Sequence, residues 1–82
     1  MFVVYALYSR AYDKIYIRFT SNMEERFKSH NELSKKGWTV KFRPWEIIYQ
    51  ENHSTKPAAM KREKELKTAT GRSFIRSLII VK

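Results

Sequence analysis

The first twenty residues contain two short apolar segments separated by a polar turn, and this pattern constrains the fold more than any other feature of the sequence. Residues 2–8 form an almost unbroken apolar run rich in strand-favouring residues, which predicts a strand covered on both faces. Residues 15–19 alternate between apolar and polar side chains, which predicts a strand with one buried face. Because only residues 9–14 separate them, we expect the two strands to pair as an antiparallel hairpin.

A helix and a third strand are predicted to follow the hairpin. Ser21 and Glu24 match a capping box, in which a hydroxyl and a carboxylate satisfy free backbone N–H groups at the start of a helix. This helix is expected to run to about residue 34. Pro44 marks the entry to a strand expected over residues 45–51.

Two helices are predicted in the last third of the chain. The first is expected over residues 56–68, where Pro57 is tolerated in the first turn. Gly71 is expected to break it before a last short helix over residues 72–81. The predicted order, ββαβαα, describes a small α+β domain with a three-stranded antiparallel-type sheet flanked by helices.

Length and composition limit the class of protein. The 82 residues are expected to form one domain, residues 1–82, with a modest core. The absence of cysteine excludes disulfides, Cys-ligated zinc and iron–sulfur clusters, and fits a cytosolic address. The apolar run at the start has no basic segment before it, so we expect no signal peptide. A formal net charge of +9 indicates a polyanionic partner, either a nucleic acid or an anionic membrane surface.

Glu63 lies in the apolar stripe of the helix expected over residues 56–68. Ala59, Glu63 and Leu66 are spaced four and three residues apart, so a carboxylate falls on the face expected to meet the core. A buried carboxylate is costly unless it is paired or binds a metal ion. Spacing alone leaves two interpretations open, a metal ligand or a carboxylate at the edge of the stripe that pairs with Lys67.

Arg26 and His30 lie four residues apart and therefore project from one face of the first predicted helix. An arginine there suits a phosphate group, because its planar fork of donors matches the phosphate oxygens. A histidine transfers protons near neutral pH. The alternative is an arginine that faces solvent and a histidine that interacts favourably with the dipole at the helix C-terminus.

Tyr5 and Tyr16 each fall in the middle of a predicted strand. If the hairpin pairs them directly, the two phenols stand side by side on one face of the sheet, and Val3 lies opposite Arg18. Phenols in such a place position water or accept a proton. The alternative is ordinary aromatic packing in the core.

In chain order, these residues resemble the motifs of the GIY-YIG endonuclease superfamily, in particular its small single-domain members related to the nuclease module of the excision-repair protein UvrC. The resemblance covers essentially the whole chain. Val3-Val4-Tyr5 and Tyr16-Ile17-Arg18 stand at the positions of the two motifs that name the family, and residues 20–31 resemble its first-helix segment. The most specific segments are Pro44-Trp45, which opens the third strand, and residues 59–67, which are similar to the helix that carries the metal-ligand glutamate.

The resemblance implies a metal-dependent nuclease site. It implies that Glu63 binds one divalent cation, Mg²⁺ or Mn²⁺, and that Tyr5 and Tyr16 line a cleft where one of them orients or deprotonates the attacking water. It also implies that Arg26 stabilises the scissile phosphate and that His30 assists proton transfer. Because a phenol with a pKa of ~10 is a poor base, we expect Arg26 and the metal ion to lower that pKa.

Besides Val3 in place of the glycine of the first motif, two features depart from the family pattern. Arg18 occupies the place of a motif glycine, where a long cation either holds substrate phosphate or fills the space that the substrate needs. No asparagine follows Asn52, so the asparagine that some members place after their glutamate has no match. Both features bear on catalysis and leave the expected fold unchanged.

The resemblance thus implies a cytoplasmic endonuclease that hydrolyses phosphodiester bonds in DNA, in repair or recombination. The alternative is a catalytically impaired nucleic-acid-binding module of the same fold, because of Arg18. A third hypothesis is a membrane-surface or protein-interaction domain that uses the apolar stripe of residues 74–79, which otherwise seals the core. Contacts with DNA are expected from four basic residues: Arg18, Lys14, Arg43 and Lys67.

Overall fold

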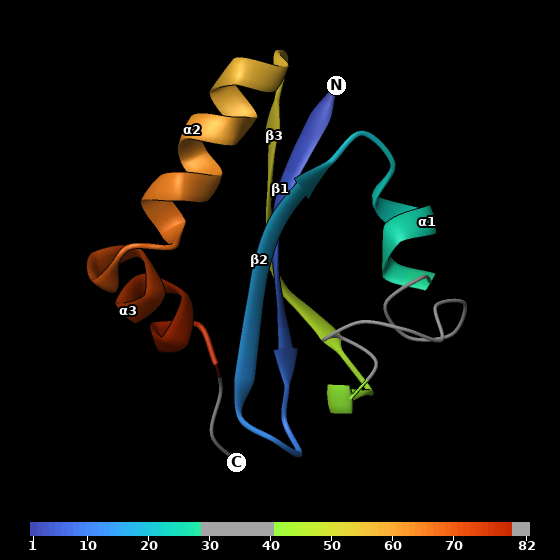
Figure 1. Cartoon of the computed structure of the whole chain (residues 1–82), viewed down its shortest axis with the longest axis vertical. Helices are drawn as coiled ribbons and strands as arrows, with labels where there is room; N and C mark the ends of the chain where they lie inside the picture. Colours follow the sequence, from blue (N-terminus) through green and yellow to red (C-terminus); the bar gives the residue numbers. More distant parts are fainter. Residues whose placement is uncertain (29–40, 80–82) are drawn as a thin grey trace.

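The computed structural model describes residues 1–28 and 41–79, and its elements follow the predicted order. These elements are β1 (Phe2–Ser9), β2 (Lys14–Thr20), α1 (Met23–Lys28), β3 (Glu46–His53), α2 (Lys56–Leu66) and α3 (Ala69–Ser77). The three strands form one antiparallel sheet in the order β2-β1-β3. Helices α2 and α3 lie on one side of this sheet and α1 on the other (Figure 1). The predicted α+β fold is confirmed.

The central strand β1 is covered on both faces, as its apolar run predicts. On one face, Val4 belongs to a buried cluster with Ala59 of α2 and Ile75 of α3. On the other face, Tyr5 packs with Trp45 and with half-buried side chains of α1. Over residues 14–18 the edge strand β2 alternates, with Ile15 and Ile17 buried and the residues between and beside them more exposed.

The register of the hairpin differs from the predicted one by two residues. Tyr5 lies opposite Arg18, and the partner of Tyr16 is Leu7. The predicted pairs of Tyr5 with Tyr16 and of Val3 with Arg18 are therefore wrong. Because the shift is an even number of residues, every side chain stays on its predicted face, and Tyr5, Tyr16 and Arg18 still share one side of the sheet.

The turn between β1 and β2 explains this shift. The backbone N–H of Tyr12 donates a hydrogen bond to the carbonyl oxygen of Ser9 over 3.3 Å, and Asp13 adopts a left-handed conformation with φ 54°. The Asp13 carboxylate is held by the Tyr8 hydroxyl and by the Arg76 guanidinium, each at 3.0 Å. The strands therefore close at the Ser9–Lys14 pair, which leaves four residues in the turn.

Helix α1 begins at an N-cap residue, Asn22, one residue later than the predicted cap at Ser21. The side-chain oxygen of Asn22 accepts a hydrogen bond from the backbone N–H of Glu25 at 3.1 Å, and its amide donates to the Glu25 carboxylate at 3.3 Å. Thr20 accepts the backbone N–H of Asn22 at 3.1 Å, which fixes this start and leaves the predicted Ser21–Glu24 pair outside the cap. The predicted continuation of the helix to residue 34 lies outside the described residues.

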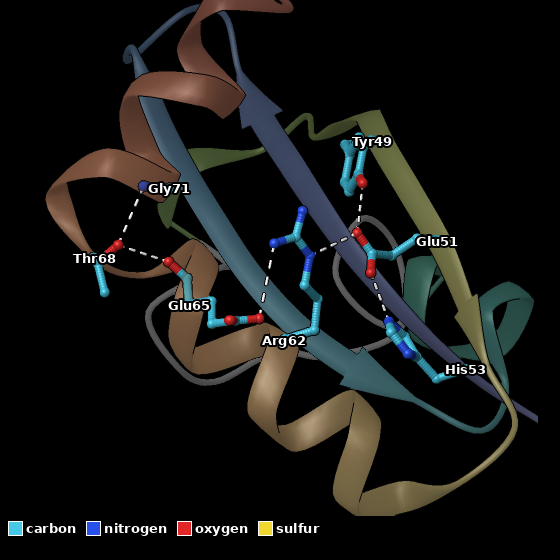
Figure 2. A network of polar contacts seen from close by, with 7 residues as sticks. All are labelled: Tyr49, Glu51, His53, Arg62, Glu65, Thr68 and Gly71. Atoms are coloured by element: carbon cyan, nitrogen blue, oxygen red, sulfur yellow. Dashed lines mark hydrogen bonds and ion pairs between the residues drawn. The ribbon is translucent and has the colours of Figure 1, made fainter.

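Gly71 lies inside α3 and does not break the chain as predicted. The break comes earlier, because Thr68 caps α3 by accepting the backbone N–H of Gly71 at 3.2 Å (Figure 2). A Cβ on Gly71 would lie 2.6 Å from the carbonyl carbon of Leu66 and closer still to the carbonyl oxygen of Glu65. Glycine therefore allows α3 to fold back against the end of α2.

The apolar stripe of the last helix is used mainly inside the molecule. Ile75 is fully buried, and Leu78 and Ile79 pack against the same core. Phe74 is 42% exposed, with its ring edge-on to Tyr49 at 5.5 Å between centroids. The stripe thus seals the core, as the structural alternative to a membrane-surface function predicts. In the described part of the chain, no helix combines the length and apolar character needed to span a bilayer.

A polar network ties α2 to β3 (Figure 2). The carboxylate of Glu51 accepts hydrogen bonds from the Tyr49 hydroxyl at 2.5 Å and from the Arg62 guanidinium at 2.9 Å, and it lies 2.6 Å from Nε2 of His53. Burial acts to raise the pKa of Glu51, but the hydrogen bonds from Tyr49, Arg62 and His53 outweigh it, so the pKa is lowered. The network holds α2 at a fixed place over the edge of β3.

Replacing Glu51 by glutamine is expected to reduce the acid sensitivity of the fold. A lowered folded-state pKa contributes stability that is fully present above the unfolded-state pKa of ~4.3 and is lost as the pH falls through the folded-state value. The variant should therefore be less stable at pH 7 by about 1–3 kcal/mol and should lose less stability than wild type on acidification. Urea unfolding at pH values from 7 to 3 measures both effects. Equal acid dependence of the two proteins would contradict this role of Glu51.

Candidate active site

The two tyrosines lie on the face of the sheet that α1 covers. Tyr5, on the central strand, is 1% exposed and packs with Leu7 and Trp45. Tyr16, on the edge strand β2, is half-buried, with its ring centroid 6.2 Å from that of Trp45. Arg18 follows on the same face of β2 and is exposed, opposite Tyr5. The phenols are therefore diagonal neighbours, and Tyr16 is the more accessible one.

The pKa of Tyr5 is set by burial and by the charged groups near it. Burial, followed by the neighbouring phenol of Tyr16, raises the pKa of Tyr5 to about 12. Arg26 and Arg18 act in the opposite direction, and Glu63 adds to the increase. As expected, Arg26 by itself acts to lower the pKa of this phenol. Burial raises the pKa by more, so the net change is an increase. Tyr5 stays protonated at neutral pH and is a hydrogen-bond donor there.

Glu63 is turned inward from α2, as the stripe predicts. Ala59 and Leu66, the other members of the stripe, are fully or almost fully buried, and the Glu63 side chain is only 14% exposed. One carboxylate oxygen, Oε1, accepts a hydrogen bond from Nζ of Lys67 at 3.2 Å. The other, Oε2, lies 3.8 Å from Nε of Arg18. The pairing with Lys67 is therefore confirmed, and the role of Glu63 as a metal ligand stays a prediction.

The Oε2 atom of Glu63 is the kind of ligand that suits a hard divalent cation. Oε2 is buried and has no hydrogen-bond partner among the described residues. Mg²⁺ prefers oxygen ligands and commonly keeps several waters while it binds one or two carboxylates. Within residues 1–28 and 41–79 no group of three or more acidic, histidine or cysteine side chains is suited to a metal ion, so Glu63 would be the main protein ligand. The positive charges of Arg18 and Lys67 would compete with such a cation.

The remaining predicted site residues are Arg26, His30 and Arg43. Arg26, on α1, is exposed and lines a small hollow beside Thr20 and Asn22, within electrostatic reach of Tyr5. His30 lies outside the described residues. Arg43 is half-buried beside Trp45.

A groove of about 680 Å³ lies along the outer edge of β2, and two of its lining residues, Arg18 and Lys67, contact Glu63. Its residues come from the hairpin and β2 on one side and from the end of α2 and from α3 on the other. They are Asp13, Lys14, Ile15, Tyr16, Ile17, Arg18, Lys67, Arg72 and Arg76. Three of the basic residues predicted to contact DNA, Lys14, Arg18 and Lys67, therefore line one groove together with Tyr16.

Sequence reasoning missed two basic residues of this groove, Arg72 and Arg76. Their spacing of four residues places them on one face of α3, which is a usable signal. The signal was hidden because a basic face on a short helix usually means only contact with water, and because Gly71 was expected to end the preceding helix. Their place in the groove follows from the fold of α3 back over the edge of β2.

Comparison with known proteins identifies a matching family. Residues 1–76 match the family model of the GIY-YIG catalytic domain. A UPF0213 protein of Staphylococcus haemolyticus is 39% identical over 56 residues, which cover 68% of each chain. UPF0213 proteins of Staphylococcus epidermidis and Staphylococcus aureus are 38% and 34% identical, over 68% and 76% of each chain.

No solved structure matches the chain significantly. The family match nevertheless spans both strands of the tyrosine pair, the helix with Arg26 and the helix with Glu63. These elements place the phenols on the face of the sheet that α1 covers and Glu63 on α2 at the other face, with Arg18 at the edge of β2 in contact with the carboxylate. The chain belongs to the GIY-YIG family, whose catalytic domain is that of a nuclease superfamily, and its relatives are the small UPF0213 proteins.

Proposed function

We propose that this chain is a divalent-metal-dependent endonuclease that hydrolyses phosphodiester bonds in DNA. The observation that carries the proposal is the carboxylate of Glu63. This carboxylate is mostly buried, and its Oε2 atom has no hydrogen-bond partner among the described residues. It lies next to Arg18, and its charge acts to raise the pKa of Tyr5. A role in repair or recombination in the cytoplasm, like that of UvrC-related nucleases, is part of the proposal.

Each residue of the site has a chemical role in the proposal. Tyr5 remains an uncharged phenol because its pKa is raised to about 12, and, since it is 1% exposed, it acts as a buried neighbour of Tyr16. Tyr16 lines the groove and positions the attacking water or takes its proton. Arg26 carries the positive charge that stabilises the phosphate as negative charge develops. His30, by the family resemblance, protonates the leaving oxygen.

The reaction balances with these groups. The oxygen of a water molecule forms a bond to phosphorus and loses one proton, while the bond between phosphorus and the leaving oxygen breaks and that oxygen gains a proton. A bound Mg²⁺ or Mn²⁺ would supply Lewis-acid stabilisation of the charged phosphorane. The protein contributes position, desolvation and fixed positive charge.

Incubation of the purified protein with supercoiled and branched DNA tests the proposal. We expect nicked or cut products with Mg²⁺ or Mn²⁺ and none when EDTA is present. Binding of the same DNA is measured in parallel in EDTA. Binding without cleavage under any metal condition would contradict the endonuclease and favour the binding module.

The position of Arg18 favours a second candidate function, a DNA-binding module with reduced cleavage. Nε of Arg18 lies 3.8 Å from the Glu63 oxygen that would meet a metal ion, and the side chain stands opposite Tyr5. A positive charge so close opposes the binding of a second cation. In this candidate the groove still binds DNA, but the metal ion is held weakly.

The Arg18→Gly substitution is expected to lower the Mg²⁺ concentration that gives half-maximal cleavage, by roughly a factor of ten, because repulsion between the guanidinium and the metal ion is relieved. DNA affinity should fall at the same time, since one phosphate contact is lost. Cleavage rates across a Mg²⁺ titration measure the effect. Arg18→Gln keeps the bulk and removes the charge, so a change in Arg18→Gly alone would show that space matters and not charge. A Mg²⁺ requirement unchanged in both variants would contradict the competition.

A further inference from the structure

The groove beside β2 carries more positive charge than three other hollows among the described residues. Five of its side chains are cationic and one, Asp13, is anionic. The hollow beside α1 contains Glu25 and Arg26, and the hollow over α2 and α3 contains Arg62 and Glu65. In both of these hollows the charges cancel, and the same is true of the hollow lined by Arg10 and Glu46. The positive charge is therefore concentrated in this groove and is not spread evenly over the hollows compared.

Arg72 and Arg76 have defined positions in the groove but can still bind a phosphate group. Nη1 of Arg76 pairs with Asp13 at 3.0 Å, and both side chains are about half exposed or more. Exposed ion pairs of this kind contribute little stability, so a phosphate can replace Asp13 as the partner of Arg76. Nε of Arg72 donates to the carbonyl oxygen of Lys67 at 3.3 Å, which fixes the start of the side chain. Both guanidinium groups are thus oriented by the fold before any ligand arrives.

The length and the lining of the groove match a nucleic-acid backbone. Lys14 and Arg18, at its two ends on β2, are four residues apart, a distance of about 13 Å in a strand. At a rise of about 3.4 Å per nucleotide this is the length of about four nucleotides. Ile15, Ile17 and Tyr16 supply apolar surface between the charges. Such an arrangement suits sugars packed between phosphates.

We infer that the groove binds the phosphate backbone of the cleaved DNA strand on one side of the scissile phosphate, with Arg72 and Arg76 as its main contacts away from the site of cleavage. The inference rests on the proposed function for the identity of the ligand. The direction of the bound strand along the groove follows from two placements. Lys67 and Arg18 contact the Glu63 carboxylate at one part of the groove. Arg76 pairs with Asp13 in the hairpin turn at another part. The strand therefore runs from the Glu63 carboxylate along β2 toward residues 10–13.

The test measures equilibrium binding and needs no cleavage. The affinity of the full chain for a fluorescent DNA duplex is measured in EDTA at several salt concentrations, for wild type and for the double variant Arg72→Gln/Arg76→Gln. Each lost phosphate contact reduces the slope of log affinity against log salt by about 0.9, so we expect a reduction of about 1.8 and roughly a tenfold loss of affinity. Arg72→Gln alone, which leaves the Asp13–Arg76 pair intact, should give half of the change in slope.

A matched control separates the groove from net charge. Lys56→Gln/Lys61→Gln removes two exposed cations of α2 that do not line the groove, and it should leave the slope close to that of wild type. An equal loss in both double variants, or no loss in the groove variant, would overturn the inference. If wild type binds DNA through the groove but never cuts it, the proposed nuclease fails and the groove stands. If it cuts DNA and the groove variant binds normally, only the groove fails.

Discussion

The substitution Glu63→Gln is expected to reduce DNA cleavage by about a thousandfold while DNA binding is retained. Glutamine has nearly the same shape but carries no negative charge, so it removes the one buried carboxylate oxygen that has no hydrogen-bond partner among the described residues. The positive charges of Lys67 and Arg18 then lose their shared partner, which should leave the affinity for DNA equal or slightly higher. Initial rates at saturating DNA and Mg²⁺ measure the loss.

Glu65→Gln is the matched control for this experiment. Glu65 lies on the same helix two residues further on, but its side chain is 54% exposed and forms an exposed ion pair with Arg62 at 3.8 Å. Removing its charge should change cleavage less than twofold, because exposed ion pairs contribute little. A Glu63→Gln variant as active as Glu65→Gln would show that the buried carboxylate takes no part in the reaction.

The substitution Gly71→Ala is expected to destabilise the fold by about 2–4 kcal/mol, which corresponds to a decrease in Tm of roughly 10–20 °C for a domain of this size. In an exposed helix the same change stabilises by about 1 kcal/mol, so the expected sign is reversed. The reason is the contact between helices, because a methyl group on Gly71 would lie 2.6 Å from the carbonyl carbon of Leu66 and closer still to other backbone atoms. Backbone atoms cannot move aside unless α3 separates from α2.

Ser73→Ala provides the comparison within α3. Ser73 is exposed, and alanine is the better helix former, so this variant should be as stable as wild type or slightly more stable. Thermal unfolding followed by circular dichroism gives both Tm values. If Gly71→Ala proves as stable as Ser73→Ala, the close approach of α2 and α3 is not a constraint on the fold.

The arrangement of elements could be predicted from the sequence because the local patterns agree with the fold. The apolar run of β1, the alternation in β2 and the buried spacing of Ala59 and Leu66 each correspond to a buried face in the structure. The register of the hairpin was not accessible, because it depends on a turn closed by the left-handed Asp13 and by its long-range pair with Arg76. Such tertiary contacts leave no periodic signal in the sequence.

The candidate site also combines features that the sequence predicts with features that it does not. The inward position of Glu63 follows from helical spacing, and the shared face of Tyr5 and Tyr16 follows from the alternation of the strands. The raised pKa of Tyr5 does not, because it results mainly from burial under α1 and Trp45. Gly71 was misjudged for a similar reason, since a glycine needed for close packing and a glycine that breaks a helix look alike in sequence.

The central claim is that the buried carboxylate of Glu63 receives a divalent cation beside Arg18, at the edge of β2. Anomalous diffraction from crystals grown with Mn²⁺ tests this claim most directly, for wild type and for Glu63→Gln. The account predicts a manganese peak in coordination with a Glu63 oxygen in wild type and no peak there in the variant. A manganese peak bound elsewhere, or a protein that cuts DNA with Mn²⁺ while the Glu63 site stays without metal, would contradict it.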